Sequence, residues 1–179
     1  GQALTHLGVE RRQVDAVLLH PHKASIDEVK SVAERLWYPI WDAGLKLSPA
    51  VHSTKSVLAL AADDLDTATS LLAVRPLAGD PAVVAEVNAG ALEQWRRRPF
   101  VWLQRLSDTA TERWAKCGDV ASLLEPDLKD GRGGLRDYDA IRWALKVDRP
   151  EIASALDGPV DDLAGPAEAL LAARCELHR

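Results

Sequence analysis

From residue 54 to the end of the chain, apolar residues recur at helical spacing, and only one short run before them has the composition of a buried strand. Apolar side chains three and four positions apart are typical of amphipathic helices. The pattern therefore predicts an α+β chain that is mostly helical, in which a small sheet is followed by a helical bundle. The helices expected after the sheet cover residues 56–62, 65–77, 81–95, 99–114, 138–147 and 167–179.

The strand-forming run is residues 14–20, Val-Asp-Ala-Val-Leu-Leu-His, and a proline follows it directly. A short apolar run that ends in turn residues predicts a buried strand. Alternation over residues 45–53 predicts a second strand, which Pro49 restricts to the edge or the end of a sheet. We therefore expect one domain over residues 1–55 and a helical domain over residues 56–179.

Between the two expected strands, apolar residues at helical spacing predict a helix over residues 26–44. Ser25 is the expected N-cap and Glu28 its capping-box partner, because Glu28 stands three residues further on. Pro39 falls inside this pattern, and a proline in a helix interior predicts a kink or a break.

The composition is that of a soluble globular chain and excludes several classes of partner. The 179 residues are 47% hydrophobic and carry a net charge of −5, which argues against general binding to nucleic acid or to an anionic membrane. No apolar run approaches the roughly 20 residues of a membrane helix, and two cysteines make no disulfide framework, which predicts a cytoplasmic location. Because the sequence contains no methionine, we expect it to be a piece of a longer polypeptide.

The segment with the strongest chemical pattern is residues 124–137, Leu-Glu-Pro-Asp-Leu-Lys-Asp-Gly-Arg-Gly-Gly-Leu-Arg-Asp. Glycines that let the backbone approach a ligand, basic side chains and the start of a helix together predict an anion site suited to a phosphate. The alternative is a turn between two helices, in which Asp137 caps the second one. The glycines are Gly131, Gly133 and Gly134, and the basic residues are Lys129, Arg132 and Arg136.

Residues 125–137 resemble the segment that follows the nucleotidyltransferase domain of bacterial PII-protein uridylyltransferases, and a related segment occurs in glutamine synthetase adenylyltransferases. Three further stretches resemble the uridylyltransferases in the same order, and so does the closing stretch. These are residues 17–20, 36–46, 64–80 and 170–179. We identify the chain as a fragment that covers the end of the nucleotidyltransferase domain and the helical domain after it.

The resemblance implies a catalytic fold like that of DNA polymerase β, of which residues 1–55 would be a remnant. In such enzymes, carboxylates hold Mg²⁺ ions that orient UTP or ATP for attack by a tyrosine of the PII signalling protein. It also implies roles for individual residues. Asp15 aligns with a catalytic, metal-binding carboxylate, and the residues expected near the nucleotide phosphates are Gly1, Lys129, Arg132, Gly133, Gly134 and Arg136.

The sequence departs from the family at the metal site. Gln13 stands where the family has the first carboxylate of its Asp-x-Asp pair, and Arg12 replaces a serine of the phosphate-binding turn. A neutral amide binds Mg²⁺ less well than a carboxylate, so we expect impaired transfer. The third carboxylate has no assignment beyond three nearby candidates. These are Asp63, Asp64 and Asp66.

Two alternatives to an active transferase remain open at this point. One is a catalytically dead module that keeps the fold for protein–protein regulation, and the other is a helical structural module whose glycine-rich loop is only a turn. Other patterns favour structural roles. Trp37 and Trp41, one helical turn apart, are expected in a core, and His20 and His22 are expected in a loop, without a zinc ion.

Overall fold

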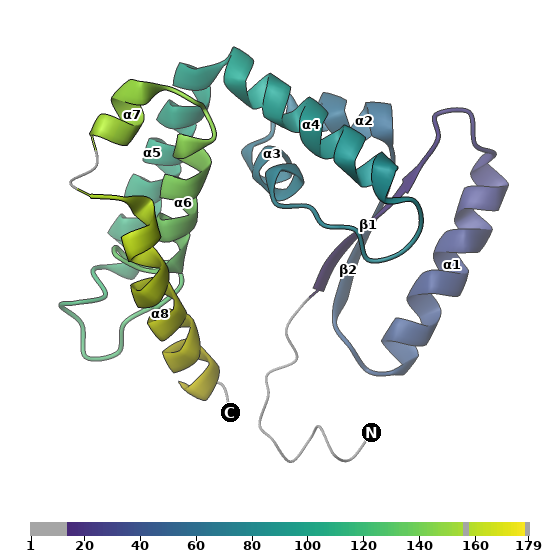
Figure 1. The fold of residues 1–179 in the computed structure, drawn as a ribbon. Helices are drawn as coiled ribbons and strands as arrows, with labels where there is room; N and C mark the ends of the chain where they lie inside the picture. The colour runs from purple at the N-terminus through teal and green to yellow at the C-terminus, as the bar shows by residue number, and fades with distance from the viewer. Residues whose placement is uncertain (1–13, 156–157, 178–179) are drawn as a thin grey trace. The chain divides into compact units, whose positions relative to one another are not determined.

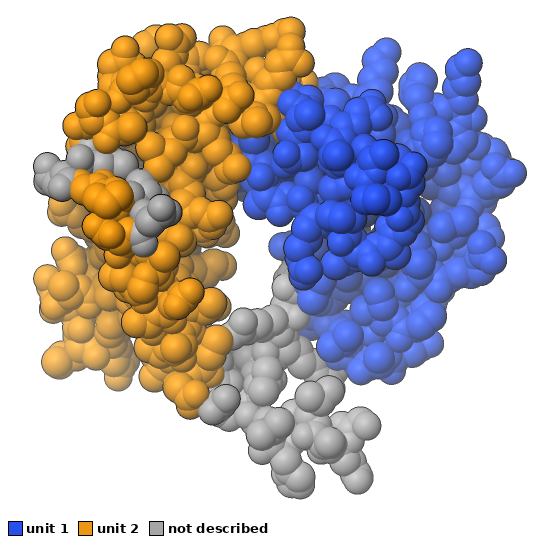
Figure 2. Space-filling model, in the orientation of Figure 1, with its two compact units in different colours: residues 1–90, 178–179 blue, residues 91–177 orange. Residues whose placement is uncertain are grey.

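The computed structural model describes residues 14–155 and 158–177, and the chain divides into two compact units. Unit 1 holds residues 1–90 with 178–179, and unit 2 holds residues 91–177 (Figures 1 and 2). The described part is mostly helical with one small sheet, as the sequence predicts. The boundary between the units falls inside a helix, and the expected domain boundary near residue 55 stays a prediction, as does the nucleotidyltransferase origin of the sheet.

The sheet of unit 1 consists of β1 (Val14–His20) and β2 (Leu47–Ser53), which pair in parallel with Asp15 opposite Ser48. Parallel strands need a crossover connection, and α1 (Ile26–Asp42) supplies it alongside the strands (Figure 1). Both predicted strands are therefore present, the second from Leu47 onward. The expected burial of the first is wrong, because every residue of β1 is exposed or half-buried. Pro49 is accommodated because, among the described residues, β2 pairs only with β1, so the missing N–H of Pro49 lies within an edge strand.

Helix α1 differs from its prediction in two respects. It runs unbroken through Pro39, and Ser25 is its N-cap residue but makes no side-chain capping hydrogen bond. Its end is as expected: Gly44 takes a positive φ of 75°, and Leu45 N donates to Ile40 O at 3.3 Å. Together with the bond from Gly44 N to Trp41 O, this is a Schellman motif, which stops the helix just before β2.

Three helices complete unit 1 and contain most of its buried apolar side chains. Asn88 on the last of them donates from Nδ2 to Leu71 O at 2.9 Å, which ties two helices together. A Cβ on Gly90 would lie 2.9 Å from Leu58 Cδ1, so the glycine permits close packing there. The three helices are α2 (Thr54–Ala61), α3 (Leu65–Leu72) and α4 (Pro81–Arg97), the last of which continues into unit 2.

The outer face of α1 is largely exposed. Ala33 is the only buried residue of the whole helix, whereas Ile26 is 85% exposed and Trp41 is 41% exposed. The expectation that Trp37 and Trp41 belong to a core is therefore wrong for Trp41, and Trp37 is only half-buried. Among the described residues, nothing packs over this face closely enough to bury it, although the apolar spacing of the helix is regular.

Unit 2 is built around two stacked tryptophans. Trp95 and Trp102 are each 1% exposed, and their rings lie 4.9 Å apart with 11° between their planes. Trp95 Nε1 donates to Trp143 O at 3.0 Å, which joins the end of α4 to a later helix. These tryptophans belong to the core, as their spacing predicts. The remaining helices are α5 (Pro99–Cys117), α6 (Leu135–Leu145), α7 (Pro150–Ser154) and α8 (Ala164–Leu177), with a short 3₁₀ helix, η2 (Val160–Leu163), before the last.

Several helix ends lie away from their predicted positions. α3 stops at Leu72, five residues early, whereas α6 begins at Leu135, three residues before the expected start. α8 takes Pro166 into its first turn, where a missing backbone N–H costs nothing. Within the described part of the chain, none of the helices combines the length and the apolar character needed to cross a membrane. The cytoplasmic location stays a prediction.

Candidate functional site

The glycine-rich segment lies between α5 and α6 and is folded back on itself. Gly118 ends α5 with a positive φ of 68°, and an isolated bridge then pairs Asp119 with Arg132. Arg132 N donates to Gly118 O at 2.8 Å, and Val120 N donates to Arg132 O at 3.0 Å. The two ends of a long connection are thus held together by backbone hydrogen bonds, which gives the loop a defined shape.

A turn around Asp127 shapes the tip of the loop. Its Oδ1 accepts hydrogen bonds from Lys129 N and Asp130 N, both at 2.9 Å. The bond from Asp130 N, followed by that from Lys129 N, lowers the pKa of the Asp127 carboxyl, although partial burial opposes the shift. This is an Asx turn, so a side chain takes over backbone donors that the turn leaves unpaired.

The first amides of α6 are also used inside the loop. Leu135 N donates to Leu128 O at 3.0 Å, and Arg136 N donates to Lys129 O at 2.9 Å. The sequence predicts that the start of this helix offers free N–H groups to a phosphate. In this conformation these two donors are occupied, so any phosphate at the loop would depend on the basic side chains.

Asp137 is the residue around which the loop is organised. Its Oδ1 accepts from Arg113 Nη2 at 2.8 Å, and its Oδ2 accepts from Trp114 Nε1 at 2.9 Å and from Gly133 N at 2.8 Å. The Asp137 and Arg113 side chains are only 17% and 18% exposed. Arg113 also donates from Nη1 to Asp130 O at 3.0 Å. The loop therefore closes around a carboxylate of its own chain, with donors from α5 on one side and loop backbone on the other.

The three loop glycines are required for different reasons. Gly133 has a φ of 82°, and a Cβ built on it would meet no atom within 4 Å. A Cβ on Gly134 would lie 2.8 Å from Gly131 O, and one on Gly131 would lie 2.7 Å from Asp127 O. Only Gly133 thus needs the left-handed conformation that the sequence pattern suggests for all three. The other two make room for the carbonyls of the loop itself.

The predicted phosphate-binding residues do not all face the same space. The Arg132 guanidinium stacks over the Trp114 ring, 5.2 Å from its centroid, and Arg136 Nε lies 3.7 Å from Asp130 Oδ1. Arg132 and Gly133 line a cavity, whereas Lys129, Gly134 and Arg136 do not line it. Phosphate binding by these residues stays a prediction.

Asp15 lies on β1, and its exposed side chain makes no hydrogen bond or ion pair with the described residues. Asp64, one candidate for the third carboxylate, caps α3 by accepting from Thr67 N at 2.7 Å. Across residues 14–155 and 158–177, no three His, Cys, Asp or Glu side chains come close enough to hold a metal ion. The described part of the chain therefore does not supply a complete Mg²⁺ site. Gly1, Arg12 and Gln13 lie outside the described residues.

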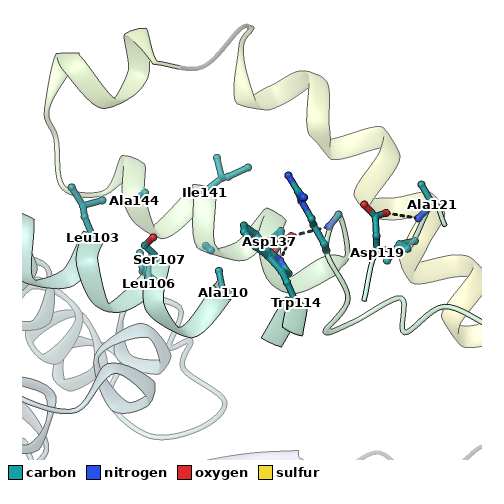
Figure 3. Close-up of a pocket in the computed structure, with 14 residues that line it drawn as sticks. Leu103, Leu106, Ser107, Ala110, Trp114, Asp119, Ala121, Asp137, Ile141 and Ala144 are labelled. Carbon is teal, nitrogen blue, oxygen red and sulfur yellow. Dashed lines mark hydrogen bonds between the residues drawn. The ribbon is translucent and has the colours of Figure 1, made fainter. Parts of the chain in front are cut away.

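A cavity of about 680 Å³ lies between α5 and α6 in unit 2 (Figure 3). Small side chains from both helices are among the residues that line it. Apolar side chains line one end, and the Asp137–Trp114 cluster lies at the other (Figure 3). The small residues are Ser107 and Ala110 on α5 and Ala140 and Ala144 on α6.

Comparison with known proteins places this site in a family. The family model described as GlnD PII-uridylyltransferase matches residues 102–178, which include the loop, the Asp137 cluster and the cavity. The chain is also similar to curated proteins named bifunctional uridylyltransferase/uridylyl-removing enzyme. One from Mycobacterium tuberculosis is 39% identical over 96% of this chain, and one from Streptomyces coelicolor is 38% identical over 94%.

The chain belongs to the PII-uridylyltransferase family. A relative from Xanthomonas campestris is 35% identical over 74% of the chain. These matches cover 22%, 19% and 15% of the respective relatives, so the chain spans about a fifth of their length. No solved structure matches the chain.

Sequence reasoning finds the loop of this family but misses two of its features. Its alternative interpretation of the loop makes Asp137 a helix cap, whereas the Asp137 carboxylate forms one cluster with Trp114 and Arg113. It also misses the cavity. The alternating small and large residues on the facing stripes of α5 and α6 are the signal that points to a hollow, but reading it requires knowing that the two helices face each other.

Proposed function

We propose that this chain is part of a PII-protein nucleotidyltransferase, which transfers UMP or AMP from a nucleoside triphosphate to a tyrosine of the PII signalling protein. What supports the proposal is similarity over 96% of the chain to enzymes named for uridylyl transfer and removal. In this proposal, Lys129, Arg132 and Arg136 contact the triphosphate, since their charge suits phosphate oxygens. Asp15 is the carboxylate offered to Mg²⁺.

We propose further that transfer by this chain is impaired. Gln13 stands in the position of a metal-binding carboxylate, and Asp15 has no acidic neighbours that would complete a metal site among the described residues. A magnesium ion stabilises the charge that develops in phosphoryl transfer and aligns the displacement, so the loss of a ligand removes much of the rate. The described residues therefore fit the ion incompletely.

A second candidate is favoured by the same observation. A chain that keeps the fold and the glycine-rich loop but not the acidic pair would serve as a regulatory module that contacts another protein. The two candidates differ in whether the chain binds nucleotide with Mg²⁺, so binding is the measurement that separates them.

The test is calorimetric titration of the folded chain with Mg²⁺–UTP and with Mg²⁺–ATP. We expect the double variant Lys129→Ala/Arg136→Ala to bind at least about tenfold more weakly, because two charged contacts are lost. Lys116→Ala/Arg149→Ala is the matched control, since it removes the same charge from exposed positions outside the loop. Unchanged affinity in the loop variant contradicts the phosphate assignment.

Two more variants test the metal assignment. Asp15→Asn should abolish the Mg²⁺-dependent part of the binding, whereas Asp27→Asn, also exposed in unit 1, should leave it unchanged. Gln13→Asp restores the acidic pair and should strengthen Mg²⁺-dependent binding and increase nucleotidyl attachment to PII, which mass spectrometry of the PII tyrosine measures. Binding of neither nucleotide by the folded chain, before and after Gln13→Asp, favours the regulatory module.

A further inference from the structure

The cavity between α5 and α6 has the size and lining of a small-molecule site. Its volume of about 680 Å³ lies within the range of about 300–1,000 Å³ typical of ligand pockets. One end is apolar, with Leu103, Leu106 and Ile141 in its wall (Figure 3).

The cavity wall also carries three charged side chains, Arg132, Asp119 and Asp137. Arg132 lies over the Trp114 ring, and no carboxylate among the described residues lies within ion-pair distance of its guanidinium. The uncharged ring leaves the guanidinium N–H donors without a hydrogen-bond partner among the described residues. Arg132 therefore faces the cavity as a cation held in place by an aromatic ring.

The carboxylates that share this wall have other partners. Asp137 accepts from Arg113, Trp114 and Gly133, and Asp119 Oδ1 accepts from Ala121 N at 2.8 Å. Gly133, beside Arg132, faces space that holds no atom within 4 Å of its Cβ position. The loop backbone at Gly133 therefore borders open space, and Gly133 and Arg132 both line the cavity.

We propose that the α5–α6 cavity binds a small organic acid, with an apolar planar body between the two helices and a carboxylate on Arg132. The apolar wall accounts for the body of the ligand, and the guanidinium accounts for the carboxylate, since arginine and carboxylate match in charge and geometry. This site goes beyond the proposed nucleotidyl transfer, and it requires neither nucleotide nor metal. Because Arg132 is assigned to both ligands, a triphosphate and the acid would compete for its guanidinium.

The test compares two probes of one shape, 2-naphthoate and its neutral amide, 2-naphthamide, by NMR titration of the labelled 179-residue chain without nucleotide or Mg²⁺. We expect both to shift amide signals of α5 and α6 around the cavity. The acid should bind about tenfold more tightly than the amide, because hydrogen bonds to a charged partner are stronger than neutral ones. Shifts confined to other surfaces, or no binding of either probe, overturn the proposal.

Variants of the cavity wall test which residues contact the carboxylate and which contact the apolar body of the ligand. Arg132→Gln should remove the preference for the acid while leaving amide binding unchanged, and Arg132→Lys should restore part of it. Arg136→Gln is the matched control, because it removes an arginine of the same loop that does not line the cavity. Ala144→Phe, or Ala140→Leu if the first does not fold, should prevent binding of both probes. A preference for the acid that survives in Arg132→Gln contradicts the site.

Discussion

The two units of this chain differ in how far they bury their tryptophans. Unit 2 encloses a stacked tryptophan pair and closes its loop around a buried ion pair. Unit 1 has a sheet of two parallel strands, and the outer face of its crossover helix is exposed. Parallel sheets are normally covered on both faces, and two strands alone are marginal. Regular secondary structure is thus present in both units, but the aromatic side chains that are fully buried among the described residues, Trp95 and Trp102, both belong to unit 2.

The largest expected effect contrasts tryptophans of the two units. Trp102→Ala should lower the free energy of unfolding by about 3–5 kcal/mol, since it leaves a cavity beside Trp95. Trp41→Ala should cost only about 1–2 kcal/mol, because Trp41 is already 41% exposed. Urea unfolding followed by far-ultraviolet circular dichroism measures both. Equal losses would mean that the units do not differ in packing as described.

A smaller effect contrasts carboxylates of the two units. Asp137→Asn should lower the free energy of unfolding by about 2–3 kcal/mol, because Arg113 loses its ionic partner in a place with little water. Asp15→Asn should change it by less than about 0.5 kcal/mol, since Asp15 is exposed. Thermal unfolding of the two variants beside the parent chain measures the difference. An unchanged free energy of unfolding in Asp137→Asn would mean that the Asp137–Arg113 contact does not stabilise the loop.

The smallest expected effects are on the pH dependence of stability, through two carboxyl groups of unit 2, Asp127 and Asp139. Backbone hydrogen bonds lower the pKa of Asp127, so its ionised form stabilises the fold above the ordinary Asp pKa, and this contribution is lost as the pH falls through the lowered value. Burial raises the pKa of Asp139. The contribution of this group to the stability of the fold is therefore fully present below the ordinary Asp pKa and is lost as the pH rises through the raised value.

We expect Asp127→Asn to destabilise the chain by a few tenths of a kcal/mol at pH 7, since solvent screens this exposed group, and by less at pH 3. Asp139→Asn should be neutral or stabilising at pH 7 and should lose that advantage at low pH. Unfolding midpoints in urea across this pH range measure both trends, and the opposite order of the two variants contradicts the assignment.

Local chemistry accounts for what the sequence predicts well. The strands at residues 14–20 and 45–53 and the end of α1 at Gly44 follow from strand-forming runs and from the left-handed conformation that glycine permits. The burial of Trp95 and Trp102 follows from helical periodicity. The exposure of Trp41 does not, because periodicity identifies an apolar face but says nothing of what covers it.

The candidate site shows the same limit. Glycines and basic residues in the loop are visible in the sequence and point to an anion, and the structure contains one in the form of Asp137. Its donors Arg113 and Trp114 lie more than twenty residues earlier on another helix, so only the tertiary fold brings them to the loop. The family comparison identifies the region, and the geometry explains why its residues stand together.

The closure of the loop around Asp137 bears on how such a motif persists during evolution. Gly131, Gly134 and Asp137 are needed for the loop to close, whether or not a nucleotide binds there. Selection for a folded protein alone would therefore retain these residues after a metal site had lost its ligands. A copy that has lost its chemistry and a working enzyme would share this stretch, and the acidic pair near the first strand is where the two would diverge.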